Sequence, residues 1–184
     1  YCLEISDNAG ILQKCEYDDY GRLSSFWKRP FSSPEKYEYD DYGRVLRVSQ
    51  AGKNLLTNFY DDSKMQINRK DSLGNISEWK FDIGGNLVSS KNRNGVFSVN
   101  EWKNGKLKFS RDFNGLESTF FYGDGGFLSR VVFSNGEKFS SAYNALGKLV
   151  FAENENSSLS FEYDSAGNLI HQKDNFSGEE IRSI

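Results

Sequence analysis

The stretch Tyr39-Asp40-Asp41-Tyr42-Gly43-Arg44-Val45 decides the fold, because it returns in altered form about every 21 residues along this 184-residue chain. The closest copies begin at Tyr17 and Tyr163, and weaker copies begin at Tyr60, Phe81, Trp102, Tyr122 and Tyr143. A fixed period of this length is typical of an architecture in which one small unit is repeated. We therefore expect the same local structure to recur from end to end.

A full copy contains an aromatic anchor, usually an Asp or Asn, two variable residues, a glycine, a polar residue and an apolar residue. Two copies are one residue shorter: the Tyr60 copy lacks the glycine, and the Trp102 copy lacks one loop residue. The glycine supplies the positive φ that a tight turn needs, and the Asp or Asn side chain accepts hydrogen bonds from the turn backbone. The apolar positions are Leu23, Val45, Met65, Leu87, Leu107, Leu128, Leu149 and Leu169. The spacing predicts that each anchor contacts its apolar residue across two antiparallel strands.

A second family of turns lies between these motifs, and several of its members are Asn-Gly pairs, which are strong hairpin signals. These pairs are Asn94-Gly95, Asn114-Gly115 and Asn135-Gly136. Aromatic residues alternate on the incoming strands, as in Tyr37/Tyr39 and Phe161/Tyr163. The sequence therefore predicts a single all-β domain over 1–184, a repeat array of about 16 to 18 short antiparallel strands. We expect a curled or partly closed sheet whose aromatic face is buried.

Composition excludes several classes of function. The formal net charge is -3 and the charges alternate in sign, so we expect neither nucleic acid nor an anionic membrane as partner. No apolar run approaches the roughly 20 residues that span a bilayer. The glycine-rich stretch Gly123-Asp124-Gly125-Gly126 lacks the Lys-Ser/Thr of a phosphate loop and is interpreted as a turn. We expect no cofactor.

The best copies of the motif, 17–23, 39–45 and 163–169, resemble the YD repeat of the RHS family. That family includes bacterial Rhs and wall-associated polymorphic toxins, shell proteins of insecticidal toxin complexes, and teneurins. The resemblance extends from about Tyr17 to Gly178 and implies β-hairpin sheets that spiral into a hollow shell around a toxic domain or other cargo. The chain departs from the family in its length, since a full shell needs several times more residues. It also contains no Asp-Pro of the kind that ends a bacterial Rhs core.

Groups that could carry catalysis are scarce. His171 is the one histidine, and we expect it to be an ordinary strand residue. The acid pairs Asp18-Asp19, Asp40-Asp41 and Asp61-Asp62 recur at one turn position, which favours turn capping over a metal site or a glycosidase. Cys2 and Cys15 are interpreted either as apolar thiols or as a disulfide. We expect no catalytic residue and no metal ligand, and hence no enzyme.

The binding candidates are Trp27, an aromatic residue near the Pro30–Pro34 loop, and the turn acids Asp18, Asp40 and Asp61. An exposed tryptophan anchors protein or glycan, and acidic turns complement a basic toxin surface. The leading hypothesis is a structural or binding module of an Rhs-like toxin system, with a toxin domain or further repeats as protein partner. The alternatives are an immunity protein that neutralises a toxin and a carbohydrate-binding module. A shell segment implies secretion or the cell surface, and an immunity protein implies the cytoplasm.

Overall fold

The computed structural model describes residues 4–176 and 179–183, and within them the secondary structure consists of 18 β-strands joined by turns, with no helix. This confirms the predicted all-β class and the predicted number of strands. Contacts between residues group the chain into two compact units, 1–97 and 98–184. The prediction of one domain stays a prediction. None of the described residues lies in a helix that could cross a bilayer.

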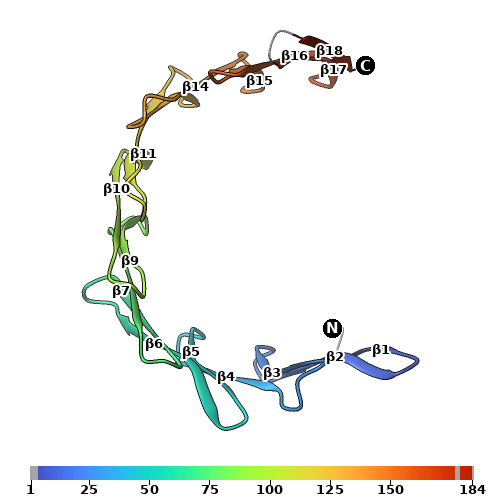
Figure 1. Cartoon of the computed structure of the whole chain (residues 1–184), viewed down its shortest axis with the longest axis vertical. Helices are drawn as coiled ribbons and strands as arrows, with labels where there is room; N and C mark the ends of the chain where they lie inside the picture. The colour runs from blue at the N-terminus through green and yellow to red at the C-terminus, as the bar shows by residue number, and fades with distance from the viewer. Residues whose placement is uncertain (1–3, 177–178, 184) are drawn as a thin grey trace. The chain divides into compact units, whose positions relative to one another are not determined.

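The strands of the first unit follow one another at short intervals. They are β1 (Glu4–Asp7), β2 (Gly10–Tyr17), β3 (Leu23–Lys28), β4 (Glu35–Tyr39), β5 (Val45–Gln50), β6 (Lys53–Asp61), β7 (Gln66–Asp71), β8 (Ile76–Phe81) and β9 (Leu87–Lys91). In the second unit they are β10 (Phe97–Lys103), β11 (Lys106–Arg111), β12 (Glu117–Tyr122), β13 (Leu128–Phe133), β14 (Lys138–Tyr143), β15 (Leu149–Glu153), β16 (Ser157–Tyr163), β17 (Leu169–Phe176) and β18 (Glu179–Ser183). Within each unit, every strand pairs antiparallel with the next strand in the chain, as can be followed in Figure 1.

Most hairpins use one type of turn, and the β4–β5 hairpin illustrates it. The backbone N–H of Asp40 donates to the carbonyl of Arg44 at 2.9 Å, and the N–H of Gly43 donates to the carbonyl of Asp40 at 3.0 Å. Gly43 has a φ of 79°, a value that strains any residue with a Cβ. A β-bulge lies just before the anchor, between Glu38 and Tyr39. The bulge absorbs the extra residue of the turn and keeps the two strands paired.

The Asn-Gly pairs do form hairpin turns, but these turns are of the type seen in the β4–β5 hairpin rather than two-residue loops. At Asn94-Gly95, the N–H of Gly95 donates to the carbonyl of Asn92, and only Gly95 has a positive φ. Two-residue loops occur at Ala51-Gly52 and Asn104-Gly105, where both residues have a positive φ, as a type I′ turn requires. The lost loop residue of the Trp102 copy is thus explained by the shorter turn.

The predicted pairing of anchor and apolar residue is confirmed in seven copies. The cross-strand pairs are Tyr17–Leu23, Tyr39–Val45, Phe81–Leu87, Trp102–Leu107, Tyr122–Leu128, Tyr143–Leu149 and Tyr163–Leu169. For Tyr60 the prediction is wrong, because Tyr60 pairs with Ile67 rather than with Met65. This turn has no glycine, and Met65 itself adopts the left-handed conformation, with a φ of 49°. Met65 is therefore a loop residue and not a strand partner.

Burial alternates along the strands and distinguishes the two faces of the sheet. In β12, Ser118, Phe120 and Tyr122 are half-buried and the residues between them are exposed. The side chains that are most buried lie on this aromatic face; for example, Val48 is opposite Tyr37 and Val131 is opposite Phe120. These two valines are 7% and 6% exposed.

The expectation that the aromatic face is buried is wrong within the described residues. No large side chain there is fully buried, and the anchors Tyr39, Tyr60, Tyr122 and Tyr163 are only half-buried. Each unit is a single meander, so its rings are covered by side chains of neighbouring strands rather than by a second layer. A sheet of this kind retains apolar surface that another layer would normally cover.

Candidate binding surface

Successive hairpins are joined by the hydroxyl groups of the anchor tyrosines. Four of these hydroxyls each donate a hydrogen bond to the main-chain carbonyl of the apolar residue in the preceding repeat. The pairs are Tyr39 Oη to Leu23 O at 2.6 Å, Tyr60 to Val45 at 2.9 Å, Tyr122 to Leu107 at 2.9 Å and Tyr163 to Leu149 at 2.9 Å. In the Tyr143 repeat, the hydroxyl of Ser141 donates to Leu128 O instead. The aromatic face is therefore also a set of joints between repeats.

Cations strengthen the same joints from the turn side. The guanidinium of Arg44 lies over the ring of Tyr60, with its carbon 4.1 Å from the ring centroid. Its Nε donates to Asp40 at 2.7 Å, and its two terminal nitrogens donate to Asp62 at 2.6 and 3.2 Å. The hydrogen bonds that Arg44 donates to Asp62 and Asp40 raise its pKa above the ordinary value. Arg44 is thus held by two carboxylates and also lies over a second ring, that of Tyr42, at 5.1 Å.

Other repeats fill the position of Arg44 with related side chains. Arg22 lies over Tyr39 at 4.6 Å, and the Lys148 ammonium lies over Tyr163 at 5.2 Å. In the second unit, Phe127 takes this position and stacks on Tyr143, with ring centroids 4.9 Å apart. These contacts are consistent with cation–π and stacking contributions of about 0.5–1.5 kcal/mol each.

The predicted turn acids are occupied by their own turns. Asp40 Oδ1 accepts the N–H groups of Tyr42 and Arg44 at 3.0 and 2.8 Å, and Asp18 does the same for Tyr20 and Arg22. Partial burial raises the pKa of Asp18 and Asp40, but hydrogen bonds from the turn backbone and the arginine outweigh it and leave both pKa values below normal. These carboxylates cap turns, as their recurrence indicated.

Asp61 has the same role in the glycine-free turn. Hydrogen bonds from the Lys64 ammonium at 2.7 Å and the Ser63 hydroxyl at 2.6 Å lower the pKa of Asp61 to about 2. Asp18, Asp40 and Asp61 lie in three separate turns and do not converge on one site. The neighbours Asp19 and Asp41 are exposed, and their carboxylates are the ones open to a partner. The acid after the anchor caps the turn in all three copies, whereas the next acid is exposed at Asp19 and Asp41 but accepts hydrogen bonds from Arg44 at Asp62.

Exposed apolar residues at the turn tips were missed by the sequence reasoning. In the first unit Tyr20, Tyr42 and Ile83 are 84%, 81% and 93% exposed, and in the second unit Leu146 is 69% exposed. All four occupy variable positions of the main-motif turn, where a polar residue would be expected. An apolar residue at a turn position that is usually polar could have indicated these exposed side chains from the sequence.

The remaining candidates are unremarkable in placement. Trp27 lies in β3 and is half-buried, as are Trp79 and Trp102, so Trp27 is not distinguished from them by exposure. His171 is opposite Glu162 across the β16–β17 pair. Cys15 is a free, half-buried thiol, and Cys2 lies outside the described residues. No group of three or more potential metal ligands occurs within the described residues.

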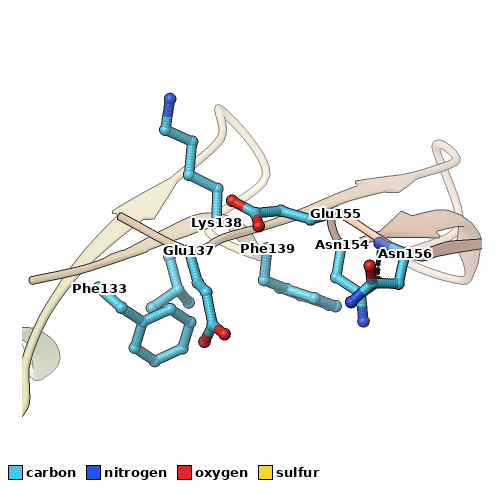
Figure 2. Close-up of a pocket in the computed structure, with 8 residues that line it drawn as sticks. Phe133, Glu137, Lys138, Phe139, Asn154, Glu155 and Asn156 are labelled. Carbon is cyan, nitrogen blue, oxygen red and sulfur yellow. Dashed lines mark hydrogen bonds between the residues drawn. The ribbon is translucent and has the colours of Figure 1, made fainter. Parts of the chain in front are cut away.

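A depression of about 380 Å³ opens on the second unit, between the β13–β14 hairpin and the β15–β16 turn. Its lining residues are Val131, Phe133, Glu137, Lys138, Phe139, Asn154, Glu155 and Asn156. Figure 2 shows that the Lys138 side chain projects to the opposite side of the ribbon from Phe133 and Glu137. In the same view Phe139 extends to the side of Phe133 and Glu137, whereas the Glu155 carboxylate lies on the side of Lys138.

The fold is similar to segments of much larger toxin-complex proteins. The crystal structures of TcdB2-TccC3-Cdc42 and of TcdB2-TccC3 each give a TM-score of 0.66, with 14% and 13% sequence identity; the likeness covers 89% and 92% of this chain and 10% and 11% of those chains. The Photorhabdus luminescens Tc holotoxin pore, with a mutant TccC3, gives a TM-score of 0.58 at 13% identity over 94% of this chain and 10% of that chain.

This chain thus spans about a tenth of the length of the structures it is similar to. No protein-family model matches the sequence, and no curated protein matches it. At such low identity the likeness shows the fold alone: an antiparallel hairpin repeat of the kind found within toxin-complex proteins.

Proposed function

We propose that this chain is a non-enzymatic repeat module that forms part of a protein shell or scaffold in a toxin system. The observation that carries the proposal is the half-covered aromatic face, four of whose tyrosines also join their repeat to the one before. A face of this kind is stabilised when further protein covers it. The fold likeness to segments of toxin-complex proteins supports this assignment.

The distribution of polar groups supports a structural role over a catalytic one. Catalysis requires a few unlike groups within hydrogen-bond reach of one another and of a substrate. Here the acids with lowered pKa values, such as Asp40, Asp61 and Asp82, each hold their own turn. Their hydrogen-bonding capacity is used in keeping hairpins closed.

Hydroxyl-radical footprinting tests the proposal. The 184-residue chain alone is compared with the same segment in the protein expressed from its native gene and purified with whatever it binds. We expect the half-buried rings of Tyr39, Tyr60 and Tyr122 to be labelled in the isolated chain and protected in the native assembly. Equal labelling of these rings in both samples would contradict the shell or scaffold assignment.

A second candidate function is capture of a protein at the turn edge, as in an immunity protein that neutralises a toxin domain. The row of exposed side chains Tyr20, Tyr42 and Ile83, with the open acids Asp19 and Asp41 beside it, favours this candidate. In the footprinting experiment, protection confined to these turn tips and absent from the aromatic face would select it over the shell segment.

A further inference from the structure

Four Asn-Gly pairs lie in turns of this chain, at 94–95, 104–105, 114–115 and 135–136. Asparagine is a chemically labile residue, and a following glycine favours attack of the backbone nitrogen on the side-chain amide because glycine has no Cβ to hinder the approach. The asparagine and the glycine of every pair are exposed. Exposure therefore does not distinguish the four pairs, whereas the hydrogen bonding of the glycine nitrogen does.

In three of the pairs, the glycine N–H is bonded within its own turn. The bonds are Gly95 to the carbonyl of Asn92 at 2.9 Å, Gly115 to that of Asp112 at 3.1 Å and Gly136 to that of Phe133 at 3.0 Å. A bonded backbone amide gives up its proton only when the structure around it opens. Because the nitrogen must lose this proton before it attacks, these three turns should slow the reaction.

The pair Asn104-Gly105 has a different geometry. It forms the two-residue loop between β10 and β11, and its residues have φ values of 52° and 71°. In a loop of this type, the cross-strand hydrogen bonds are made by the two flanking residues and not by the loop residues themselves. Within residues 4–176 and 179–183, the Gly105 N–H and the Asn104 side chain have no hydrogen-bond partner. A Cβ at Gly105 would have nothing within 4 Å, so the approach to its nitrogen is open.

We propose that Asn104 is a site of spontaneous modification, at which the Gly105 nitrogen displaces ammonia from the Asn104 side chain, and that the three bonded turns protect their asparagines. Hydroxide removes the Gly105 N–H proton, and the nitrogen attacks the side-chain carbonyl carbon. The new C–N bond closes a succinimide ring, the bond to the side-chain nitrogen breaks, and ammonia leaves with a proton from water. Water then opens the ring at one of its two carbonyls, which gives aspartate or isoaspartate. One water is consumed and one ammonia is released, so the reaction balances without a further reactant.

The isoaspartate product changes the backbone of the loop. It routes the main chain through the former side chain and adds one methylene to the path from Asn104 to Gly105. The loop joins Lys103 and Lys106, which lie directly opposite each other, and a two-residue turn has no spare length. We therefore expect the β10–β11 hairpin to open from its turn. The reaction concerns this loop alone and is independent of the proposed function.

Comparison of the folded and unfolded chains gives each pair its own control. The 184-residue chain is incubated in mildly alkaline water enriched in heavy oxygen, with and without guanidinium chloride, and deamidation of each pair is followed by peptide mass spectrometry. We expect folding to change the rate at Asn104 by no more than a few-fold and to slow the other three asparagines at least tenfold. Slowing at Asn104 that equals or exceeds that at any of the other three would overturn the proposal.

A variant can release one of the protected pairs. The side-chain oxygen of Asn92 accepts the N–H groups of Asn94 and Val96 at 2.9 and 3.1 Å, and this cap holds the turn in which Gly95 is bonded. Asn92→Ala should therefore raise the rate at Asn94 several-fold and leave the rate at Asn104 unchanged. If Asn94 reacts as slowly in this variant as in the parent chain, the turn is not what protects it and the proposal fails.

The expected opening of the hairpin has a matched control. Asn104→Asp gains the same negative charge as the isoaspartate product but keeps the normal backbone length. Amide hydrogen exchange of residues 102–107 should be at least several-fold faster in the isoaspartate form than in Asn104→Asp. Equal exchange in the two forms would reject the opening of the β10–β11 hairpin.

Discussion

The hydroxyl of Tyr39 donates a hydrogen bond of 2.6 Å to the carbonyl of Leu23, sixteen residues earlier, and thereby connects two successive hairpins. Partial burial raises the pKa of Tyr39, so the hydroxyl stays protonated and remains a donor at neutral pH. Because this hydrogen bond is made by a side chain, a mutation can remove it without removing any of the main-chain hydrogen bonds between strands.

Removing that hydroxyl should weaken the fold measurably. Tyr39→Phe keeps the ring and loses one hydrogen bond, so we expect a loss of about 1 kcal/mol in the free energy of unfolding. Tyr39→Ala also removes the ring and should cost about 3 kcal/mol. The control is Tyr42→Phe, whose hydroxyl belongs to an exposed turn residue and should matter little. Urea unfolding measures all three, and a Tyr39→Phe variant as stable as Tyr42→Phe would contradict the role of the joint.

Replacing Arg44 with lysine should lower the stability of the fold. Lysine cannot donate to Asp40 and to both oxygens of Asp62 while lying over Tyr60, so Arg44→Lys should lower the urea midpoint. The matched change is Arg47→Lys, because Arg47 pairs only with the exposed Glu38 in the ion pairs of the described residues. We expect a smaller shift there. Similar midpoints for the two variants would show that the Arg44 cluster adds no stability.

Acid should destabilise the chain through its turn aspartates. In Asp82 and Asp164, hydrogen bonds from Asn86 and Asn168 lower the pKa below the ordinary 3.8. The folded chain therefore binds these protons less readily than the unfolded chain. The stabilisation is fully present above the unfolded pKa and is lost as the pH falls through the lower folded pKa. We expect the urea midpoint to fall between about pH 4 and about pH 2, the lower bound following from the pKa of about 2 at Asp61.

Asparagine provides the matching substitution. Asn144 caps an equivalent turn by accepting the N–H groups of Leu146 and Lys148, each at 3.0 Å, and it does not titrate. Asp82→Asn with Asp164→Asn should keep stability near neutral pH and reduce the loss in acid. Asp19→Asn with Asp41→Asn, at exposed acids of the same motif, should leave the acid loss as it was. The prediction fails if both double variants have the same pH profile.

Two turn glycines allow a test of close packing between hairpins. Gly21 and Gly147 have nearly the same φ, 77° and 74°, but a Cβ at Gly147 would lie 2.6 Å from the Phe127 ring, whereas nothing lies within 4 Å at Gly21. Gly21→Ala should cost about 1–2 kcal/mol through backbone strain alone. Gly147→Ala should cost about 1–3 kcal/mol more, because the Phe127 ring must move from its stack on Tyr143. Thermal unfolding compares the two variants. An equal loss of stability in both would show that the Phe127 ring moves aside at no cost.

Much of the fold was predictable because each turn is determined by residues within its own copy of the motif. Asp40 caps its turn, Gly43 accepts the left-handed conformation, and the period of about 21 residues then places Tyr39 opposite Val45. The Tyr60 copy departed from prediction because, without a glycine, Met65 took the left-handed position and the register moved to Ile67.

The candidate surface was less predictable, because it depends on contacts between repeats. Nothing in the spacing indicated that the Arg44 side chain reaches the ring of Tyr60 in the next repeat, or that the Tyr60 hydroxyl reaches back to Val45. The depression beside Phe133 likewise needs turn 154–156, which lies about twenty residues further along the chain. The motif showed which residue types recur, but it did not show which side chains of different repeats are in contact.

Each tyrosine joint reaches only to the preceding repeat, which has a consequence for how such a chain can change in size. Duplicating or deleting one whole period would add or remove one hairpin and one joint while leaving every other joint intact. Recombination can therefore change the number of repeats without breaking the tyrosine joints of the repeats that remain, and the width of the sheet changes with that number.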